Sequence, residues 1–207
     1  MKEKEPFRPL RAKPLLIVLS GPSGVGKDVV LARMKELGYP LHYTMTATTR
    51  PQREGESDGA DYHFISPARF EEMVKRGELL EWAKVYGNRY GVPKHQVEEA
   101  LGRGLDVIVK ADVQGAATIK GVVPQALLIF LAPPSMEQLE ERLRQRKTES
   151  TIDLNLRIET AREEMKCLPM FDYVVVNRQD RPDLAVAQID AIITAEKCRV
   201  TQTEVEI

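Results

Sequence analysis

Long apolar runs and cysteines are scarce in this sequence. No stretch approaches the roughly 18 apolar residues of a membrane helix, and the first apolar run is shorter than the roughly 7 to 15 residues of a signal-peptide core. Cys167 and Cys198 are too few for a disulfide framework or a zinc cluster, which favours a reducing compartment. We therefore expect a cytoplasmic protein without a membrane segment.

An excess of charge of either sign is also absent. The 30 Lys and Arg residues nearly balance the 31 Asp and Glu residues among 207 in all, so the formal net charge is −1. Nucleic-acid-binding domains usually carry a basic face, so we expect no nucleic-acid partner and only local anion sites. The length suits one α/β domain with room for inserted lobes.

Short apolar runs alternate with amphipathic segments along the chain. Four runs rich in Val, Ile and Leu begin at Leu15, Asp106, Ala126 and Asp172. Unbroken apolar runs indicate strands that are covered on both faces, as in a parallel sheet. The alternation predicts an α/β fold in which helices flank a parallel sheet.

Two predicted helices have residues that are typical of helix ends. The segment 27–38 places Val30, Met34 and Leu37 on one side and ends at Gly38, a residue type that often follows a helix. The segment 135–146 begins with a Ser that has a Gln three residues later, which is the pattern of a capping box.

One region, from Thr44 to about Tyr90, breaks the alternation. It is polar, rich in turn residues and inclined to β structure. A stretch of this length without core periodicity is either a binding lobe or disordered. Its aromatic residues, which include Tyr62, Phe64 and Trp82, favour a folded lobe.

A glycine-rich segment follows the first apolar run. The residues GPSGVGK, from Gly21 to Lys27, match a phosphate-binding loop (P-loop) between a strand and a helix. Backbone N–H groups in such a loop surround phosphate oxygens, the helix N-terminus adds a partial positive charge, and Lys27 reaches the terminal phosphates. The motif continues with a Ser or Thr that binds Mg²⁺, but this chain has Asp28.

Asp28 adds a negative charge beside the phosphates. Two unit charges 4 Å apart repel by about 4 kcal/mol at an effective dielectric of 20. Either Mg²⁺, with Asp28 as a ligand, or Lys110 could offset this charge. Lys110 follows a predicted strand where related folds carry a metal-orienting Asp. The two departures suggest a charge exchange that keeps the total charge of the site; independent drift in an inactive site is the alternative.

A second anion pocket is predicted in the region that breaks the alternation. Arg50 and Arg53 lie three residues apart, and Tyr62, Glu81 and Tyr90 follow. Guanidinium groups bind phosphate through two parallel hydrogen bonds, and a tyrosine hydroxyl can donate another. Two phosphate pockets imply a kinase that acts on a phosphorylated acceptor.

Six segments together resemble guanylate kinases: GPSGVGK, TATTRPQREGESDGADYHF, LLEWAKVYGNRYG, DVQGA, FLAPPS and DYVVVN. The resemblance runs from Leu15 to Lys197. It implies phosphorylation of GMP or dGMP by MgATP, in a P-loop core with an inserted mixed β/α GMP-binding lobe and a helical lid. The expected division is a flexible tail at 1–13, a core at 14–45 and 92–207 with the lid at about 138–157, and the GMP-binding lobe at 46–91.

The resemblance also implies site residues. ATP would be bound by Ser23, Gly24, Val25, Gly26, Lys27, Asp28 and Asn177, the last of these near the adenine. The GMP phosphate would be held by Arg50, Arg53, Tyr62 and Tyr90. The base would be read by Thr46, Glu81 and Asp112. The catalytic groups would be Lys27, Arg50 and the lid arginines Arg142, Arg146 and Arg157.

The residues expected at the base suit guanine, whose N1–H and N2–H₂ donors lie beside the O6 acceptor. Two carboxylates and one hydroxyl complement that edge, and adenine offers the wrong one. Thr46 keeps the hydroxyl that the family often supplies with Ser. Val92 stands where the family often has Ser or Thr, so one hydroxyl is missing. Asp28 and Lys110 resemble variants in plastid-type and some bacterial members.

Structural alternatives remain for several residues. The lid arginines, and Arg50 with Arg53, could be surface charges only. Glu81 could be a solvated charge at a helix end, Asp112 could cap a helix, and Tyr90 could serve packing. Among functions, one alternative is an inactive guanylate-kinase-like module that binds phosphopeptides, although such modules typically erode the P-loop. Another is a kinase for a different nucleotide, which would leave Glu81 and Asp112 without a purpose. We expect ATP and GMP as small-molecule partners and a monomer or homodimer.

Overall fold

The computed structural model describes residues 12–85, 87–145 and 151–207, without the side chains of 151–153. Its main sheet is parallel and has the strand order β2-β7-β1-β8-β9. The strands are β1 (Leu16–Ser20), β2 (Leu41–Tyr43), β7 (Asp106–Lys110), β8 (Leu127–Ala132) and β9 (Tyr173–Val176). The four runs predicted as strands are confirmed, and β1, β7 and β8 have the buried cores expected of strands covered on both faces. The edge strand β9 leaves Val174 and Val176 exposed. The short β2 carries no such apolar run and was not predicted.

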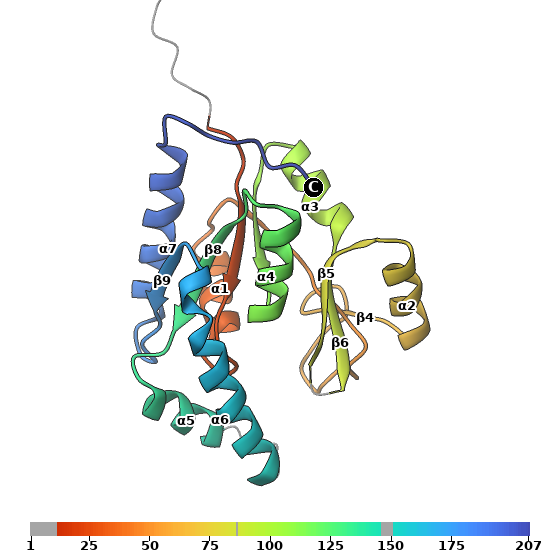
Figure 1. The fold of residues 1–207 in the computed structure, drawn as a ribbon, viewed down its shortest axis with the longest axis vertical. Helices are drawn as coiled ribbons and strands as arrows, with labels where there is room; N and C mark the ends of the chain where they lie inside the picture. The colour runs from red at the N-terminus through yellow and green to blue at the C-terminus, as the bar shows by residue number, and fades with distance from the viewer. Residues whose placement is uncertain (1–11, 86, 146–150) are drawn as a thin grey trace, which may run out of the picture.

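Helices cover both faces of this sheet (Figure 1). One face packs mainly against α1 (Lys27–Glu36) and α7 (Pro182–Lys197), and the other packs against α3 (Lys94–Gly102) and α4 (Val113–Val122). The chain after α7 crosses toward α3, where Val205 and Ile207 pack against the second face. The predicted α/β architecture is therefore confirmed.

The predicted helix ends can be compared with the structure. Gly38 follows α1 with a positive φ of 74°, as its residue type predicts, and the Ser135 hydroxyl accepts a hydrogen bond from the Gln138 N–H at 3.3 Å. Val30 and Met34 are buried, but the prediction for Leu37 is wrong. Leu37 is the C-cap residue and is 49% exposed, so the buried side of the helix ends at Met34.

A second sheet forms a lobe beside the main sheet (Figure 1). Its order is β4-β3-β6-β5, with mixed pairing. The lobe comprises β3 (Ala47–Thr48), β4 (His63–Phe64), α2 (Pro67–Lys75), β5 (Leu79–Val85) and β6 (Asn88–Pro93). The polar region is thus folded where the structure describes it, and the buried Phe70 of α2 packs its ring edge-to-face on Trp82.

Helices α5 (Met136–Gln145) and α6 (Thr151–Lys166) extend from one end of the core (Figure 1). Leu139 and Leu143 of α5 are buried, and Leu143 lies close to Gly24 of the P-loop. The middle of α6 packs against the core through Ile158 and Ala161. Within the described part of the chain, no helix is long and apolar enough to span a bilayer.

Candidate active site

The P-loop lies between β1 and α1, as predicted. Gly21 has φ 138°, and a Cβ there would overlap the Leu131 carbonyl oxygen. Gly26 has φ 100°, and a Cβ there would lie 2.6 Å from Asn177 Nδ2. Side chains at either position would therefore be strained by the backbone and by contact. Glycine is required at both positions because the loop turns closely against β8 and the end of β9.

Lys27 begins α1 and reaches back over the loop. Its Nζ donates to the carbonyl oxygens of Gly21 at 2.5 Å and Pro22 at 3.2 Å. Burial lowers the pKa of Lys27, and the nearby Glu164 carboxylate opposes that shift. The ammonium group is thus held at the mouth of the loop, where it can meet an anion that the backbone N–H groups surround.

The Val25 carbonyl anchors the loop to two other segments. It accepts hydrogen bonds from Asn177 Nδ2 at 2.9 Å and from Arg142 Nη1 at 3.2 Å. Arg142 Nη2 also donates to the Asn177 carbonyl at 3.0 Å. Asn177, expected beside the adenine, has its amide directed at the loop, and Arg142, expected at the transferring phosphoryl group, braces the same carbonyl. Both expected roles stay predictions.

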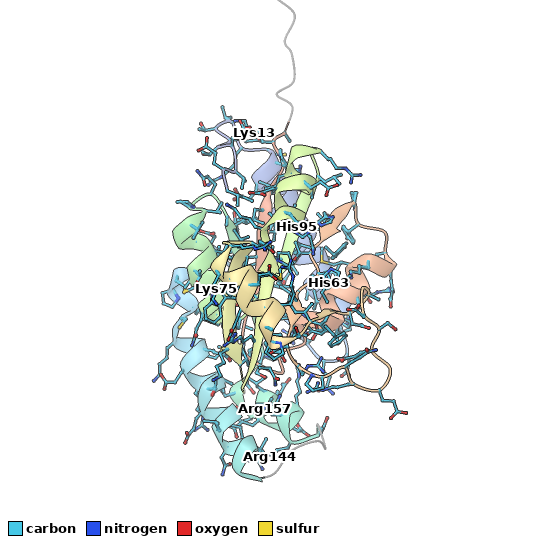
Figure 2. All side chains as sticks on the ribbon, turned by 90° about the vertical axis from the view of Figure 1, so that its right-hand side faces the viewer. Lys13, His63, Lys75, His95, Arg144 and Arg157 are labelled. Atoms are coloured by element: carbon cyan, nitrogen blue, oxygen red, sulfur yellow. The ribbon has the colours of Figure 1, made fainter. Side chains whose placement is uncertain are left out.

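Helix α6 holds the third residue of the loop. Glu164 Oε2 accepts a hydrogen bond from the Ser23 N–H at 3.1 Å, and Arg157 Nη2 donates to Ser23 Oγ at 3.3 Å. Arg157 is labelled in Figure 2 at the lower end of the molecule, and its side chain is buried. Glu164 was not predicted from the sequence, since a glutamate within REEMK reads as a solvated helix charge. Arg146, the remaining predicted lid arginine, lies outside the described residues.

Asp28 and Lys110 meet across the site. Lys110 Nζ lies 2.5 Å from Asp28 Oδ1 and donates to the Tyr62 hydroxyl oxygen at 3.0 Å. It also lies 4.6 Å from the centroid of the Tyr62 ring. Burial lowers the pKa of Lys110, but Asp28 and Tyr62 raise it by more, so its net pKa lies above the ordinary value and the ammonium keeps its charge.

Arg50 forms the centre of the second pocket. Its Nη2 bonds both carboxylate oxygens of Glu56, at 2.8 and 2.9 Å, and Nη1 donates to the Pro51 carbonyl. The guanidinium lies over the rings of Tyr62 and Phe64. Burial lowers the pKa of Arg50, while Glu56 and Tyr90 together raise it by more, so the net pKa lies above its ordinary value. Glu56 was not predicted; its two carboxylate oxygens fix the orientation of the planar guanidinium.

The other residues of the predicted phosphate pocket lie around Arg50. Tyr90 on β6 packs its ring edge on Tyr62, with centroids 6.2 Å apart, and interacts with Arg50. Arg53 is exposed and donates its backbone N–H to Glu56 Oε2 at 2.9 Å. Tyr90 therefore has the packing role that was stated above as an alternative, and its side chain also faces the Arg50 guanidinium.

The residues predicted to read a base come from both sheets. Glu81 on β5 and Thr46 before β3 are buried, and Asp112 follows β7. Asp112 caps α4, because its Oδ1 accepts a hydrogen bond from the Gly115 N–H at 2.7 Å. Val92 lies opposite Glu81 in the β5–β6 ladder and is fully buried in the core, which suits an apolar residue.

Glu81 has an unusual electrostatic environment. Its side chain is 6% exposed, and burial, helped by the Asp112 carboxylate, raises its pKa to about 8. The alternative of a solvated surface charge is therefore wrong. A buried carboxyl group with a raised pKa at a cleft is a common feature of binding and catalytic sites.

Comparisons with known proteins place these features in a family. The family model described as guanylate kinase matches residues 13–196. A guanylate kinase 2 from Oryza sativa, described as chloroplastic/mitochondrial, is 45% identical over 98% of this chain and 71% of its own length. A guanylate kinase from Shouchella clausii is 45% identical over 91% of each chain. The solved guanylate kinase of Anaplasma phagocytophilum matches with a TM-score of 0.76 at 31% identity, over 92% of this chain and 90% of that one.

Proposed function

The chain belongs to the guanylate kinase family and is a nucleoside monophosphate kinase, and we propose that it transfers the γ-phosphoryl group of ATP to GMP or dGMP. The P-loop would bind ATP and the pocket around Arg50 the acceptor phosphate. Thr46, Glu81 and Asp112 would read guanine. We further propose the division into a tail at 1–13, a core at 14–45 and 92–207 with its lid, and a GMP-binding lobe at 46–91.

The observation that carries this proposal is that one side chain joins the two anion pockets. Lys110 pairs with Asp28 of the P-loop helix and donates to Tyr62, whose ring lies under Arg50. The donor loop and the acceptor pocket therefore lie within the reach of one lysine. Phosphoryl transfer needs this arrangement, because attacking and leaving oxygens must lie roughly in line.

Catalysis at such a site depends on the positioning of the substrates and on the stabilisation of negative charge. The transferred group spreads negative charge over its oxygens, so fixed cations lower the barrier and little covalent work is left to the protein. Lys27 would neutralise the donor phosphates and Arg50 the acceptor phosphate. Arg142 and Arg157 already contact the P-loop, and with Arg146 they would complete the charge on closure of the lid. Closure would also exclude water and so limit hydrolysis of ATP.

Asp28 fits a magnesium ion that is held mainly by ATP. Its side chain is 70% exposed at the start of α1, and the described residues contain no group of three or more His, Cys, Asp or Glu that could hold a metal. Mg²⁺ usually binds one or two protein carboxylates together with substrate phosphates and water. When bound, it would neutralise charge on the β- and γ-phosphates. Asp28 is the residue that would hold it.

The ion pair between Asp28 and Lys110 predicts an interaction between two substitutions. Asp28→Ser leaves Lys110 without its carboxylate partner, so we expect kcat to fall by about 10- to 100-fold, as for other changes beside a bound metal. Adding Lys110→Asp removes the unpaired ammonium group and returns a carboxylate to the site, so it should recover part of that loss. The pair then carries one negative charge, whereas Asp28 with Lys110 carries none, so the total charge expected to be kept is not conserved by the exchange. Steady-state rates at saturating Mg²⁺ measure both variants. A double variant as slow as Asp28→Ser, or slower, would reject the coupling of the two positions.

The raised pKa of Glu81 predicts how GMP affinity changes with pH. Guanine donors need an ionised carboxylate, yet a group with pKa about 8 is mostly protonated at pH 7. Between pH 6.5 and 8 the GMP dissociation constant should therefore fall up to about tenfold per pH unit, with release of one proton on binding. Calorimetry in two buffers measures both quantities. Glu81→Gln should bind GMP weakly and without this slope; a slope that persists in Glu81→Gln would show that another group titrates.

The phosphopeptide-binding alternative has less support. An inactive module does not need a P-loop lysine, yet Lys27 is held at the mouth of an intact loop, and Arg142 and Arg157 brace that loop.

Cytoplasmic location, a monomer or homodimer, and the absence of a nucleic-acid partner stay predictions.

A coupled assay of ADP release with GMP, dGMP, AMP, UMP and CMP tests the function. We expect turnover with GMP and dGMP only. Tight binding of GMP without turnover would support the interaction module instead, and comparable rates with AMP would contradict the proposed base recognition.

A further inference from the structure

Gly115 lies against the carboxylate that is proposed to read guanine. It is buried in the first turn of α4, and its N–H donates to Asp112 Oδ1. Glu81 reaches the same turn from β5. A Cβ added to Gly115 would lie 2.7 Å from Glu81 Oε2 and 3.0 Å from Glu81 Cδ. The two carboxylates of the base pocket therefore meet at this one glycine.

The backbone does not require glycine at this position. Gly115 has helical geometry and is not among the glycines with a positive φ. Glycine is a poor helix former compared with alanine, because it gains conformational entropy when the helix unfolds. Gly121, in the same helix, would meet nothing within 4 Å if it carried a Cβ. A Cβ at Gly115 would also lie 3.2 Å from the Ala111 Cβ, but its nearest contact would be with Glu81. The distinguishing property of Gly115 is thus the space that it leaves for the Glu81 carboxylate.

We infer that Gly115 is a specificity-determining residue of the guanine pocket, where its missing side chain fixes the position of the Glu81 carboxylate. The inference rests on the proposed function. A methyl group at 115 would push the carboxylate away from α4, and Glu81 can yield because the contact involves the far end of its side chain. The fold should therefore survive while the hydrogen bonds to the base are misplaced. Displacements of 0.5 to 1 Å are large on the scale that binding sites tolerate.

The direct test compares Gly115→Ala with the matched variant Gly121→Ala. For each we would measure melting temperature, KM for ATP, and kcat/KM for GMP and for IMP, which lacks the 2-amino group. Gly115→Ala should raise KM for GMP by about tenfold or more and reduce the GMP-to-IMP preference by a similar factor, as expected for a misplaced contact. KM for ATP should stay within twofold. Gly121→Ala should leave all these kinetic values unchanged.

A rescue separates this role from simple packing. Glu81→Asp shortens the side chain by one bond, about 1.5 Å, and makes room for the added methyl group. In the Gly115→Ala/Glu81→Asp variant the loss in kcat/KM for GMP should be smaller than the product of the two single losses. If Gly115→Ala alone does not fold, the double variant should fold. A double variant that does not fold, or losses that simply multiply, would overturn the inference.

Different experimental results would contradict the inference and the proposed function. Absence of GMP turnover in the unmodified protein contradicts the function, and the comparison is then made with dissociation constants for GMP and IMP. An unchanged preference for GMP over IMP in a folded Gly115→Ala protein contradicts the role of Gly115, whether or not the unmodified protein turns over.

Discussion

Lys27→Met should lower kcat by about 10³-fold, because it removes the ammonium group at the mouth of the P-loop, where we propose that it meets the phosphates of ATP. The expected loss lies in the transition state, where charge on the transferred group is greatest. KM for GMP should change little, since Lys27 is not part of the pocket around Arg50. Rapid-quench or coupled steady-state assays at saturating ATP measure the effect.

Lys35→Met is a suitable control for this variant. Lys35 lies at the far end of the same helix and is exposed, so its removal changes the net charge equally without touching the loop. The control should keep its rate. A Lys27→Met protein that retains more than a tenth of the unmodified rate would mean that the loop is not the donor site.

Arg50→Met should raise KM for GMP by about 100-fold or more and leave KM for ATP nearly unchanged. Truncating one partner of a buried charged pair costs about 2 to 5 kcal/mol, in part because the remaining partner stays buried. Here the remaining groups would be Glu56 and the proposed acceptor phosphate, and both would lose the guanidinium that lies over the rings of Tyr62 and Phe64. Initial rates over a grid of ATP and GMP concentrations give both constants.

Arg69→Met provides the matched control in the same lobe. Arg69 is a solvated arginine on α2 that pairs with Glu72 and Glu78, and surface pairs of this kind contribute little. It should leave both constants unchanged. Equal effects of Arg50→Met on the two KM values would argue that the lobe is damaged as a whole and that Arg50 does not bind the acceptor phosphate.

The sequence predicts the main sheet well because the central strands β1, β7 and β8 are buried on both faces, so each is an unbroken apolar run. The edge strand β9 is also a run of apolar residues and was predicted for that reason, although Val174 and Val176 are exposed. The short β2 has three half-buried residues and pairs only at the sheet edge with β7, so its sequence carries no comparable signal. The exposed Leu37 shows that apolar periodicity also does not locate the last turn of a helix.

The candidate site could be predicted in part, because motifs identify residues more readily than partners. The P-loop and the arginine-rich segment are local patterns, and the negative charge of Asp28 predicted a cation nearby, with Lys110 as one of two candidates. The pairing of Lys110 with Tyr62, 48 residues away, depends on how the two sheets are arranged. Glu164 and Glu56 lie in ordinary charged stretches and gain their roles only through contacts with Ser23 and Arg50.

Binding of adenosine and guanosine joined through five phosphates tests most directly whether the two pockets act as one site. Measured by calorimetry, this compound should bind in one equivalent and more tightly than either ATP or GMP, because one molecule would fill both pockets at once. Lys27→Met and Arg50→Met should each weaken it. Affinity no greater than that of GMP alone, or binding that one of these substitutions leaves unchanged, would contradict the account.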